Sequence, residues 1–258
     1  MDIQELITLY TQDQRCQVSY PGSYREVLPH VIRHRDSSAH GEGSIIYSQL
    51  DETNADQVIR EQIHWFTAHE QSFEWKAYDY DTPPDLVARL AQHGFVIEEA
   101  ESIMVLELAQ APAMLLEPVT HKVARLTTPA ELSAVRAIED TVWESDHQGL
   151  INFLADALRN HPPQMSIYLA YVNEVAASAA WIYYPTNSRF ASLWGGSTLS
   201  EYRGRGLYTA LLAVRTQEAL SRQVEFLTVD ASPMSRPILE KFGFVRIAES
   251  YPCKWEVT

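Results

Sequence analysis

Cysteine, glycine and long apolar runs are all scarce in this chain of 258 residues, which has 2 cysteines and 10 glycines. Cys16 and Cys253 stand near opposite ends and follow no metal-ligand spacing, so we interpret both as reduced thiols and expect no metal site. No run approaches the roughly 20 apolar residues of a membrane span. The first 16 residues also lack the basic and apolar regions of a secretion signal, which predicts a cytosolic protein without a membrane partner.

Positive charge is also in short supply, with 20 Lys and Arg against 34 Asp and Glu and a formal net charge of −14. A general nucleic-acid binder needs a basic face, so this balance argues against a nucleic-acid partner. A small anionic ligand at one local basic site is compatible with it. Since 46% of the residues are hydrophobic, the chain can build one large core or two modest ones.

One segment resembles a linker, the stretch "LAQAPAMLLEPVTHK" at 108–122, where Ala and Pro interrupt the apolar pattern. It predicts a boundary near residue 115 that divides the chain into domains 1–115 and 116–258. The two sides share a pattern. The segment 76–95 aligns without gaps to 225–244, with identities at Asp81 and Asp230, Pro84 and Pro233, Leu90 and Leu239, Gly94 and Gly243, and Phe95 and Phe244.

Both aligned segments are typical of a strand, a turn with proline, an amphipathic helix and a Gly-Phe that ends the helix. Their constant offset of 149 residues predicts two related copies of one mixed α/β unit. Continued upstream, the same offset places residues 54–57 (Asn-Ala-Asp-Gln) opposite 203–206 (Arg-Gly-Arg-Gly). The first copy therefore lacks the glycine-arginine turn of the second.

This turn follows an expected strand at 189–199 and precedes an apolar helical stripe, formed by Leu207, Ala210, Leu211 and Val214. A helix N-terminus offers free N–H groups and a positive dipole end, and the two glycines let a phosphate approach the backbone. The motif is neither the nucleotide P-loop nor the dinucleotide fingerprint. Two alternatives stay open: the arginines pair with nearby carboxylates, or the turn binds another phosphorylated ligand.

Arg-Gly-x-Gly at a strand-to-helix turn, followed by a strand and a helix ending in "EKFGF" (240–244), resembles the GNAT superfamily of acyl-CoA-dependent N-acyltransferases. The resemblance covers about 117–258 and, through the repeat, extends more weakly to about 40–108. It implies a GNAT-like fold in two tandem copies, an α/β (α+β) structure with mixed sheets. The first copy is then degenerate, and the second is the acetyltransferase domain.

The resemblance implies acetyl-CoA as cosubstrate, with no metal. Its pyrophosphate would lie on the turn, and its pantetheine arm along the preceding strand. The implied cofactor-binding residues are Ser197, Thr198, Arg203, Gly204, Arg205, Gly206, Leu207, Tyr208 and Ser232. Three positions depart from the family. Ser232 stands where an asparagine often contacts the cofactor, and its hydroxyl can still form a hydrogen bond. Tyr208 stands where Gly or Ala is usual, so its phenol must point away from the phosphates or close over the cofactor. Leu239 replaces the tyrosine that protonates the departing thiolate, which leaves the acid unassigned.

Amine acylation needs a group that takes the proton of the amine. Asp230, at the end of the strand "EFLTVD", is one candidate base, although its counterpart Asp81 makes a helix N-cap an equal alternative. Glu144 and His147 are further candidates in the loop "WESDHQG" (143–149), where the family binds its acceptor. That loop is alternatively a solvated connection, and its carboxylates and imidazole lack the fixed spacing of a metal site.

The sequence thus predicts an N-acetyltransferase that moves an acetyl group directly from acetyl-CoA to a primary amine of a small molecule or a protein. Trp181, Tyr183 and Tyr184 either wall the acceptor pocket or belong to the core. The alternative is a non-catalytic acyl-CoA-binding or regulatory protein. Oligomeric state is not encoded in any pattern found here, and packed tandem copies are compatible with a monomer.

Overall fold

The computed structural model describes residues 1–36 and 41–257, and its contacts divide the chain into two compact units. The first unit contains Met1–Met104, Asp230–Glu240 and Val245–Thr258. The second contains Val105–Val229 and Lys241–Phe244. The first unit therefore takes segments from both ends of the chain. The boundary near residue 115 stays a prediction about where the two copies meet in the sequence.

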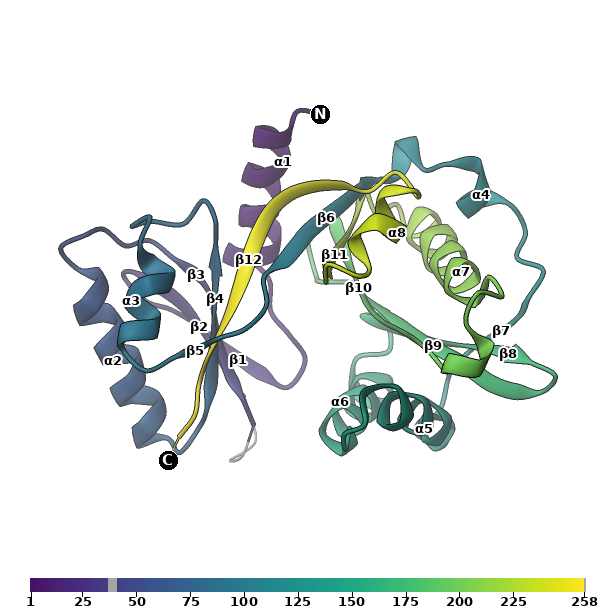
Figure 1. The fold of residues 1–258 in the computed structure, drawn as a ribbon, viewed down its shortest axis with the longest axis horizontal. Coiled ribbons are helices and arrows are strands. Elements are labelled where there is room, and N and C mark those ends of the chain that lie inside the picture. Colours follow the sequence, from purple (N-terminus) through teal and green to yellow (C-terminus); the bar gives the residue numbers. More distant parts are fainter. Residues whose placement is uncertain (37–40, 258) are drawn as a thin grey trace. The chain divides into compact units, whose positions relative to one another are not determined.

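The first unit is an open sheet with helices (Figure 1). Its elements are α1 (Ile3–Tyr10), the π-helix η1 (Thr11–Cys16), β1 (Ser23–Val27), β2 (Val31–Asp36), β3 (Gly43–Ser48), α2 (Ala55–Ala68), β4 (Phe73–Tyr78), α3 (Leu86–Gln92), β5 (Val96–Ile97), the first half of β6 (Glu101–Glu107), α8 (Arg236–Glu240) and β12 (Val245–Trp255). β1, β2 and β3 are antiparallel neighbours, and β3 pairs with β4 in parallel. β12 then pairs antiparallel with β4, from Ser250–Tyr78 to Trp255–Phe73, so the last strand of the chain completes the first unit.

The core of the first unit forms where α2 and α3 bury their apolar residues against these strands. On α2, Val58, Ile59 and Phe66 recur at helical spacing and are all buried. The Phe66 ring stacks on Phe73 of β4 with centroids 4.0 Å apart. Trp75 of β4 is fully buried in the same cluster. The helix therefore forms because its apolar stripe matches the inner face of the sheet.

The second unit repeats this arrangement. Its elements are the second half of β6, the 3₁₀ turn η2 (Leu108–Gln110), α4 (Ala113–Leu116), β7 (Lys122–Arg125), η3 (Pro129–Glu131), α5 (Leu132–Trp143), α6 (Gln148–Asn160), β8 (Met165–Val172), β9 (Val175–Tyr183), β10 (Phe190–Thr198), η4 (Ser200–Tyr202), α7 (Leu207–Ser221) and most of β11 (Phe226–Ala231). β7 to β10 are antiparallel in sequence order, and β10 pairs with β11 in parallel. Figure 1 shows α5 and α6 on one side of β8 and β9 and α7 on the other.

The mixed α/β class and the two tandem copies are confirmed. In each unit an antiparallel run of strands is followed by a helix, α2 or α7, and then by a parallel strand, β4 or β11. α3 begins at Leu86 and α8 at Arg236, close to the offset of 149 residues found in the sequence. Within the described residues, none of the helices is both long and apolar enough to cross a membrane.

Candidate functional site

The glycine-arginine turn connects β10 to α7 through backbone conformations that suit glycine. Gly204 and Gly206 have φ angles of +72° and +79°, and Gly206 is the N-cap of α7. A Cβ added to Gly204 would meet nothing within 4 Å, whereas one added to Gly206 would lie 3.2 Å from the His121 ring. The N–H groups of the first turn of α7 have no acceptor within the helix. The turn thus presents bare backbone to solvent.

Both arginines of the turn remain exposed and donate to backbone carbonyls. Arg203 Nε lies 3.1 Å from the Thr198 oxygen, and Arg205 Nη2 lies 3.2 Å from the Glu201 oxygen. Among the residues that the structure describes, neither guanidinium has a carboxylate partner, so the alternative of arginines neutralised by nearby carboxylates is not what is observed. Two exposed guanidinium groups beside a helix N-terminus favour an anion at this position.

His121 also lies at this turn, although no pattern in the sequence indicated it. Its Nε2 donates to the carbonyl oxygen of Arg205 at 2.9 Å, across 84 positions of the chain. The imidazole therefore holds the turn from outside and limits the space at Gly206. Only the pairing of distant segments reveals such a residue.

β10 separates from β11 just before the turn. Their parallel pairing covers three residue pairs, from Phe190–Phe226 to Ser192–Thr228, although β10 continues to Thr198. On its other edge β10 pairs with β9, with an irregularity between Gly195 and Ser197. Ser197 and Thr198 thus follow a bulge in a segment not paired to β11. Backbone groups on such an edge can pair with an extended ligand.

Glycines at the bulge make room for aromatic rings. A Cβ on Gly195 would lie 2.5 Å from the Trp181 ring, and one on Gly196 would lie 3.0 Å from the Tyr208 ring. The Tyr208 side chain therefore packs against β10, which accommodates the large residue at this position of the motif. Burial raises the pKa of Tyr208, and the nearby Arg215 guanidinium opposes that rise. Arg215 is itself buried and donates to the Trp181 and Trp194 carbonyl oxygens at 3.1 and 3.2 Å.

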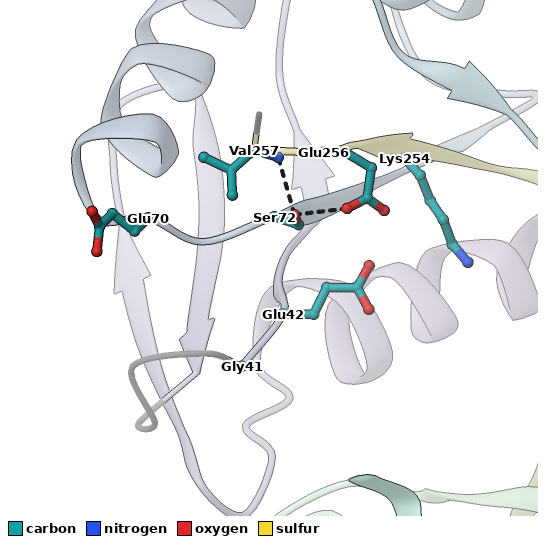
Figure 2. A pocket seen from close by; sticks show the side chains of 7 residues that line it. All are labelled: Gly41, Glu42, Glu70, Ser72, Lys254, Glu256 and Val257. Carbon is teal, nitrogen blue, oxygen red and sulfur yellow. Dashed lines mark hydrogen bonds between the residues drawn. The ribbon is translucent and has the colours of Figure 1, made fainter. Parts of the chain in front are cut away.

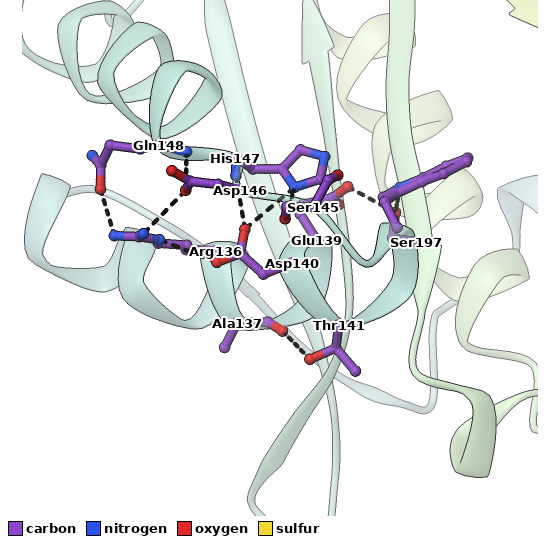
Figure 3. Close-up of polar contacts among 11 residues, drawn as sticks. Arg136, Ala137, Glu139, Asp140, Thr141, Ser145, Asp146, His147, Gln148 and Ser197 are labelled. Atoms are coloured by element: carbon purple, nitrogen blue, oxygen red, sulfur yellow. Dashed lines mark hydrogen bonds and ion pairs between the residues drawn. The ribbon is translucent and has the colours of Figure 1, made fainter.

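A buried carboxylate also contacts β10. Glu139 Oε2 accepts a hydrogen bond of 2.9 Å from Ser197 Oγ, and that hydroxyl accepts one of 3.1 Å from Trp143 Nε1. Figure 3 shows Glu139 and Ser197 facing each other between α5 and β10. Sequence reasoning missed Glu139. Its signal is its place at i+7 from Leu132 and i+4 from Val135, on the buried stripe of α5.

The two candidate bases in the loop before α6 differ in their contacts. Glu144 is exposed and ends α5 with a φ of +52°. His147 Nδ1 lies 3.2 Å from Asp140 Oδ1 and 3.0 Å from the Ser145 oxygen, and its backbone N–H also donates to Asp140 (Figure 3). This last hydrogen bond is the main cause of the lowered pKa of Asp140. The imidazole is thus tied to its own loop.

Asp230 and Ser232 lie in the first unit. The Asp230 carboxylate accepts a hydrogen bond from the Lys76 ammonium, which also contacts Glu101 at 3.0 Å. Ser232 Oγ accepts from the backbone N–H of Ser235 at 3.3 Å. In the structure Asp230 therefore forms an ion pair with Lys76 and not a helix N-cap. Its role as a base stays a prediction.

The turn of the first copy is filled by its own side chains. Asp51 Oδ1 accepts from the backbone N–H groups of Thr53 and Asn54, at 2.8 and 3.1 Å, at the start of α2. These bonds lower the pKa of Asp51, the largest contribution coming from the Thr53 hydroxyl. Asp51 thus closes the turn before α2, which begins at Ala55 after the N-cap Asn54 and is not preceded by a glycine-arginine turn.

A separate hollow of about 390 Å³ lies in the first unit. Figure 2 shows its lining, in which Ser72 Oγ donates to Glu256 at 2.9 Å and accepts from the Val257 N–H at 3.1 Å. None of the predicted site residues lines it. Among the described residues, no group of three or more His, Cys, Asp or Glu side chains is arranged to hold a metal ion.

Comparisons with known proteins agree with this geometry. The sequence model of the Acetyltransferase (GNAT) family matches residues 132–244. A search of curated proteins found no match. A GCN5-related N-acetyltransferase from Kribbella flavida has a similar structure at a TM-score of 0.67 and 14% identity, covering 98% of this chain and 93% of that one.

Two further solved structures have the same fold. A functionally unknown conserved protein from Staphylococcus epidermidis gives a TM-score of 0.67 at 12% identity, covering 93% of this chain and 96% of that one. A tandem GNAT protein from the clavulanic acid biosynthesis pathway gives 0.61 at 13% identity, covering 94% and 86%. At such identities the likeness concerns the fold. Residues 132–244 therefore form a GNAT acetyltransferase domain, in a chain whose overall fold is that of GNAT proteins, a tandem one among them.

Proposed function

We propose that the second unit is an N-acetyltransferase that moves an acetyl group from acetyl-CoA directly to a primary amine. The observation that carries the proposal is the turn at 203–206, where bare backbone at the start of α7 is flanked by two arginines that have no carboxylate partner in the described part of the chain. A pyrophosphate fits this donor set because it brings the negative charge that the turn lacks. The family match at 132–244 supports acyl transfer as the class of reaction.

The residues of the glycine-arginine turn and of β10 would hold the cofactor. The backbone of Gly204, Gly206, Leu207 and Tyr208 would hold the phosphates, and the free edge of β10 at Ser197 and Thr198 would pair with the pantetheine arm. Acetyl-CoA supplies an activated thioester carbonyl when bound. Ser232 keeps its proposed cofactor contact only as an expectation from the family resemblance.

In this proposal the first copy, at 1–115, supports the fold. The turn before α2 carries the acidic Asp51 and no arginine, and Asp56 on α2 pairs with Arg89 and His93. Neither feature favours a phosphate. We propose that this copy is degenerate and does not bind acetyl-CoA at that turn.

The first experiment is a thermal shift with acetyl-CoA on the wild type and on Gly204→Asp and Gly204→Asn. A ligand at 100 times its Kd stabilises a folded protein by about 2.7 kcal/mol. Asp and Asn both tolerate the left-handed backbone, and space around residue 204 is open, so the two variants differ chiefly in charge. We expect the wild type and Gly204→Asn to shift and Gly204→Asp to lose most of the shift.

Two other results would each change the conclusion. A shift in the wild type without release of CoA thiol, for any amine in a panel of primary amines, would favour a non-catalytic acyl-CoA-binding protein. Absence of a shift in the folded wild type would contradict the acetyl-CoA site. The turn would then either bind another phosphorylated ligand or have a purely structural role.

A further inference from the structure

Glu139 is a buried carboxylate with an incomplete set of hydrogen bonds. The residue is 3% exposed, and its Oε2 accepts from Ser197 Oγ at 2.9 Å. Its Oε1 is buried with no hydrogen-bond partner among the described residues. Leaving a buried carboxylate oxygen unpaired is unfavourable, so this oxygen can accept a water, a further donor or a proton.

The surroundings of Glu139 do not neutralise it. The charged groups that act on it are His147, which attracts, and Asp140, which repels. The strands packed against α5, β9 and β10, contain no charged residue. On α6, Asp156 accepts a hydrogen bond from Asn160, and Arg159 is exposed. No cation in the described structure is hydrogen-bonded to Glu139, so the site is ready to take up a proton.

Ser197 connects this carboxylate to an exposed aromatic residue. Its hydroxyl donates to Glu139 and accepts from the indole Nε1 of Trp143, which is 62% exposed. A large exposed indole whose N–H is fixed on a buried hydroxyl is an unusual use of tryptophan in a soluble domain. Its face is available to a cation or to an apolar group.

The position of Ser197 places this chain of contacts at the proposed reaction site. Ser197 follows the bulge of β10, in the segment not paired to β11 that we assign to the acyl-CoA arm. Its side chain points to α5, whereas the Tyr208 ring of α7 contacts the neighbouring Gly196. Glu139 and Trp143 thus approach β10 from α5, the helix that, with α6, lies opposite α7.

We propose that Ser197 and Glu139 form a proton relay for the acceptor, and that the acceptor is a primary amine with an aromatic or apolar body that packs on Trp143. The inference rests on the proposed acyltransferase function and deepens it. The amine N–H replaces the indole N–H as donor to Ser197 Oγ. Trp143 and Ser197 position the acceptor, and Glu139 holds the proton.

The proposed step balances in atoms and charge. The amine nitrogen forms a bond to the acyl carbon while the carbon–sulfur bond breaks and CoA leaves as the thiolate. The amine proton passes to Ser197 Oγ as the Ser197 proton passes to Glu139. Glu139 then releases this proton to solvent and the thiolate takes one up from solvent to become the free thiol, so the net products are the amide and CoA. An acceptor that arrives as the ammonium ion releases one further proton to solvent.

The test compares Glu139→Gln, Ser197→Ala and the double variant with the wild type. Gln keeps the shape of Glu and an oxygen that accepts from Ser197, so the fold is retained. CoA thiol release is measured with acetyl-CoA and phenethylamine, a primary amine with an aromatic body, across pH. Glu117→Gln removes an exposed carboxylate and serves as the matched control.

We expect each single variant to lower kcat about 100-fold and to leave the acetyl-CoA thermal shift unchanged. The double variant should be no slower than the slower single variant by more than about threefold, because the two residues act as one unit. The wild-type kcat should fall at low pH as Glu139 takes up a proton, and Glu139→Gln should lose that limb. A structural role alone would not move the pH profile.

Other outcomes overturn the relay. Unchanged kcat in Glu139→Gln, multiplicative losses in the double variant, or a retained acidic limb would exclude it. A wild type that binds acetyl-CoA but does not acetylate phenethylamine would overturn the proposed acceptor class. A wild type that shows no acetyl-CoA shift would instead contradict the acyltransferase function, so the two failures are distinguishable.

Discussion

The Arg15 guanidinium and the Asp81 carboxylate meet through two hydrogen bonds of 2.8 Å each, Nη1 to Oδ1 and Nη2 to Oδ2. Arg15 also donates from Nε to the Ile46 carbonyl oxygen of β3 at 2.8 Å, and its guanidinium carbon lies 3.8 Å from the centroid of the Tyr78 ring. β3 and β4 pair only from Gly43–Phe73 to Ile45–Trp75. Beyond that point Arg15 bridges β3 to the residue that corresponds to Asp230.

The first copy therefore fills, with its own side chains, the places that the second copy leaves open. Arg15 of η1 lies at the end of the parallel strand pair, and the Asp51 carboxylate accepts hydrogen bonds from the turn that precedes α2. Calorimetric titration with acetyl-CoA should accordingly give one site per chain. Two equivalent sites per chain would contradict this reading of the first unit.

Removing Arg15 should destabilise the protein strongly. Both partners are buried, with side-chain exposures of 0% for Arg15 and 5% for Asp81. Arg15→Met would leave the carboxylate buried without its cation, which costs about 3–5 kcal/mol in unfolding free energy. Urea denaturation measures this change. The double variant Arg15→Met with Asp81→Leu should recover much of the loss, and equal losses in the single and double variants would show that the ion pair is not its source.

Arginine replacements in the turn should weaken cofactor binding. A hydrogen bond to a charged group contributes about 1.5–3 kcal/mol, so Arg203→Gln and Arg205→Gln should each raise the Kd for acetyl-CoA roughly 10-fold to 100-fold. The loss should shrink as salt is added, because both side chains are exposed. Calorimetry at two ionic strengths measures it, with the exposed Arg159→Gln as control. Equal effects of all three variants would argue against a specific phosphate contact.

The buried charge of Glu139 should lower the stability of the protein at neutral pH. Burial raises the pKa of Glu139 above its usual value near 4.5, although the Ser197 hydrogen bond opposes the rise. The folded state then binds the proton more tightly than the unfolded state, so ionised Glu139 lowers stability at pH values above its folded pKa. Glu139→Gln should be more stable than the wild type at pH 7.5.

That gain should disappear as the pH falls below the usual glutamate value, where the carboxyl is protonated in both states. Urea unfolding at pH 7.5 and at pH 4 compares the two proteins. A variant that is less stable at both values would mean that the charge of Glu139 supports the fold. In the expected case, the ionised Glu139 lowers the free energy of unfolding, and the protein retains it because the proposed reaction uses it.

Local patterns in the sequence were sufficient for the elements around the glycine-arginine turn. The predicted strand 189–199 is β10 at Phe190–Thr198, and Leu207, Ala210 and Leu211 are buried on α7 as their spacing indicated. These elements depend on periodicity and on glycine conformation, which a short window of sequence contains.

Contacts between distant residues were not accessible in the same way. His121 meets Arg205, and Arg15 meets Asp81, through pairings that no periodicity marks. Glu139 carried a signal in the sequence, because a carboxylate on the apolar stripe of α5 is out of place there. Two of the candidate bases predicted from the sequence instead lie in the exposed polar loop at 143–149. The burial of a charge is thus a better guide to this site than the density of charges along the chain.

β12 has a consequence for how the protein is made. The strand that completes the sheet of the first unit follows the whole second unit along the chain, and six of its residues pair with β4. Most residues of the first unit therefore leave the ribosome before the second unit does, yet their sheet lacks this partner strand until the second unit has been translated. The first unit thus cannot complete its sheet on its own during synthesis, because its completion requires translation of the second unit first.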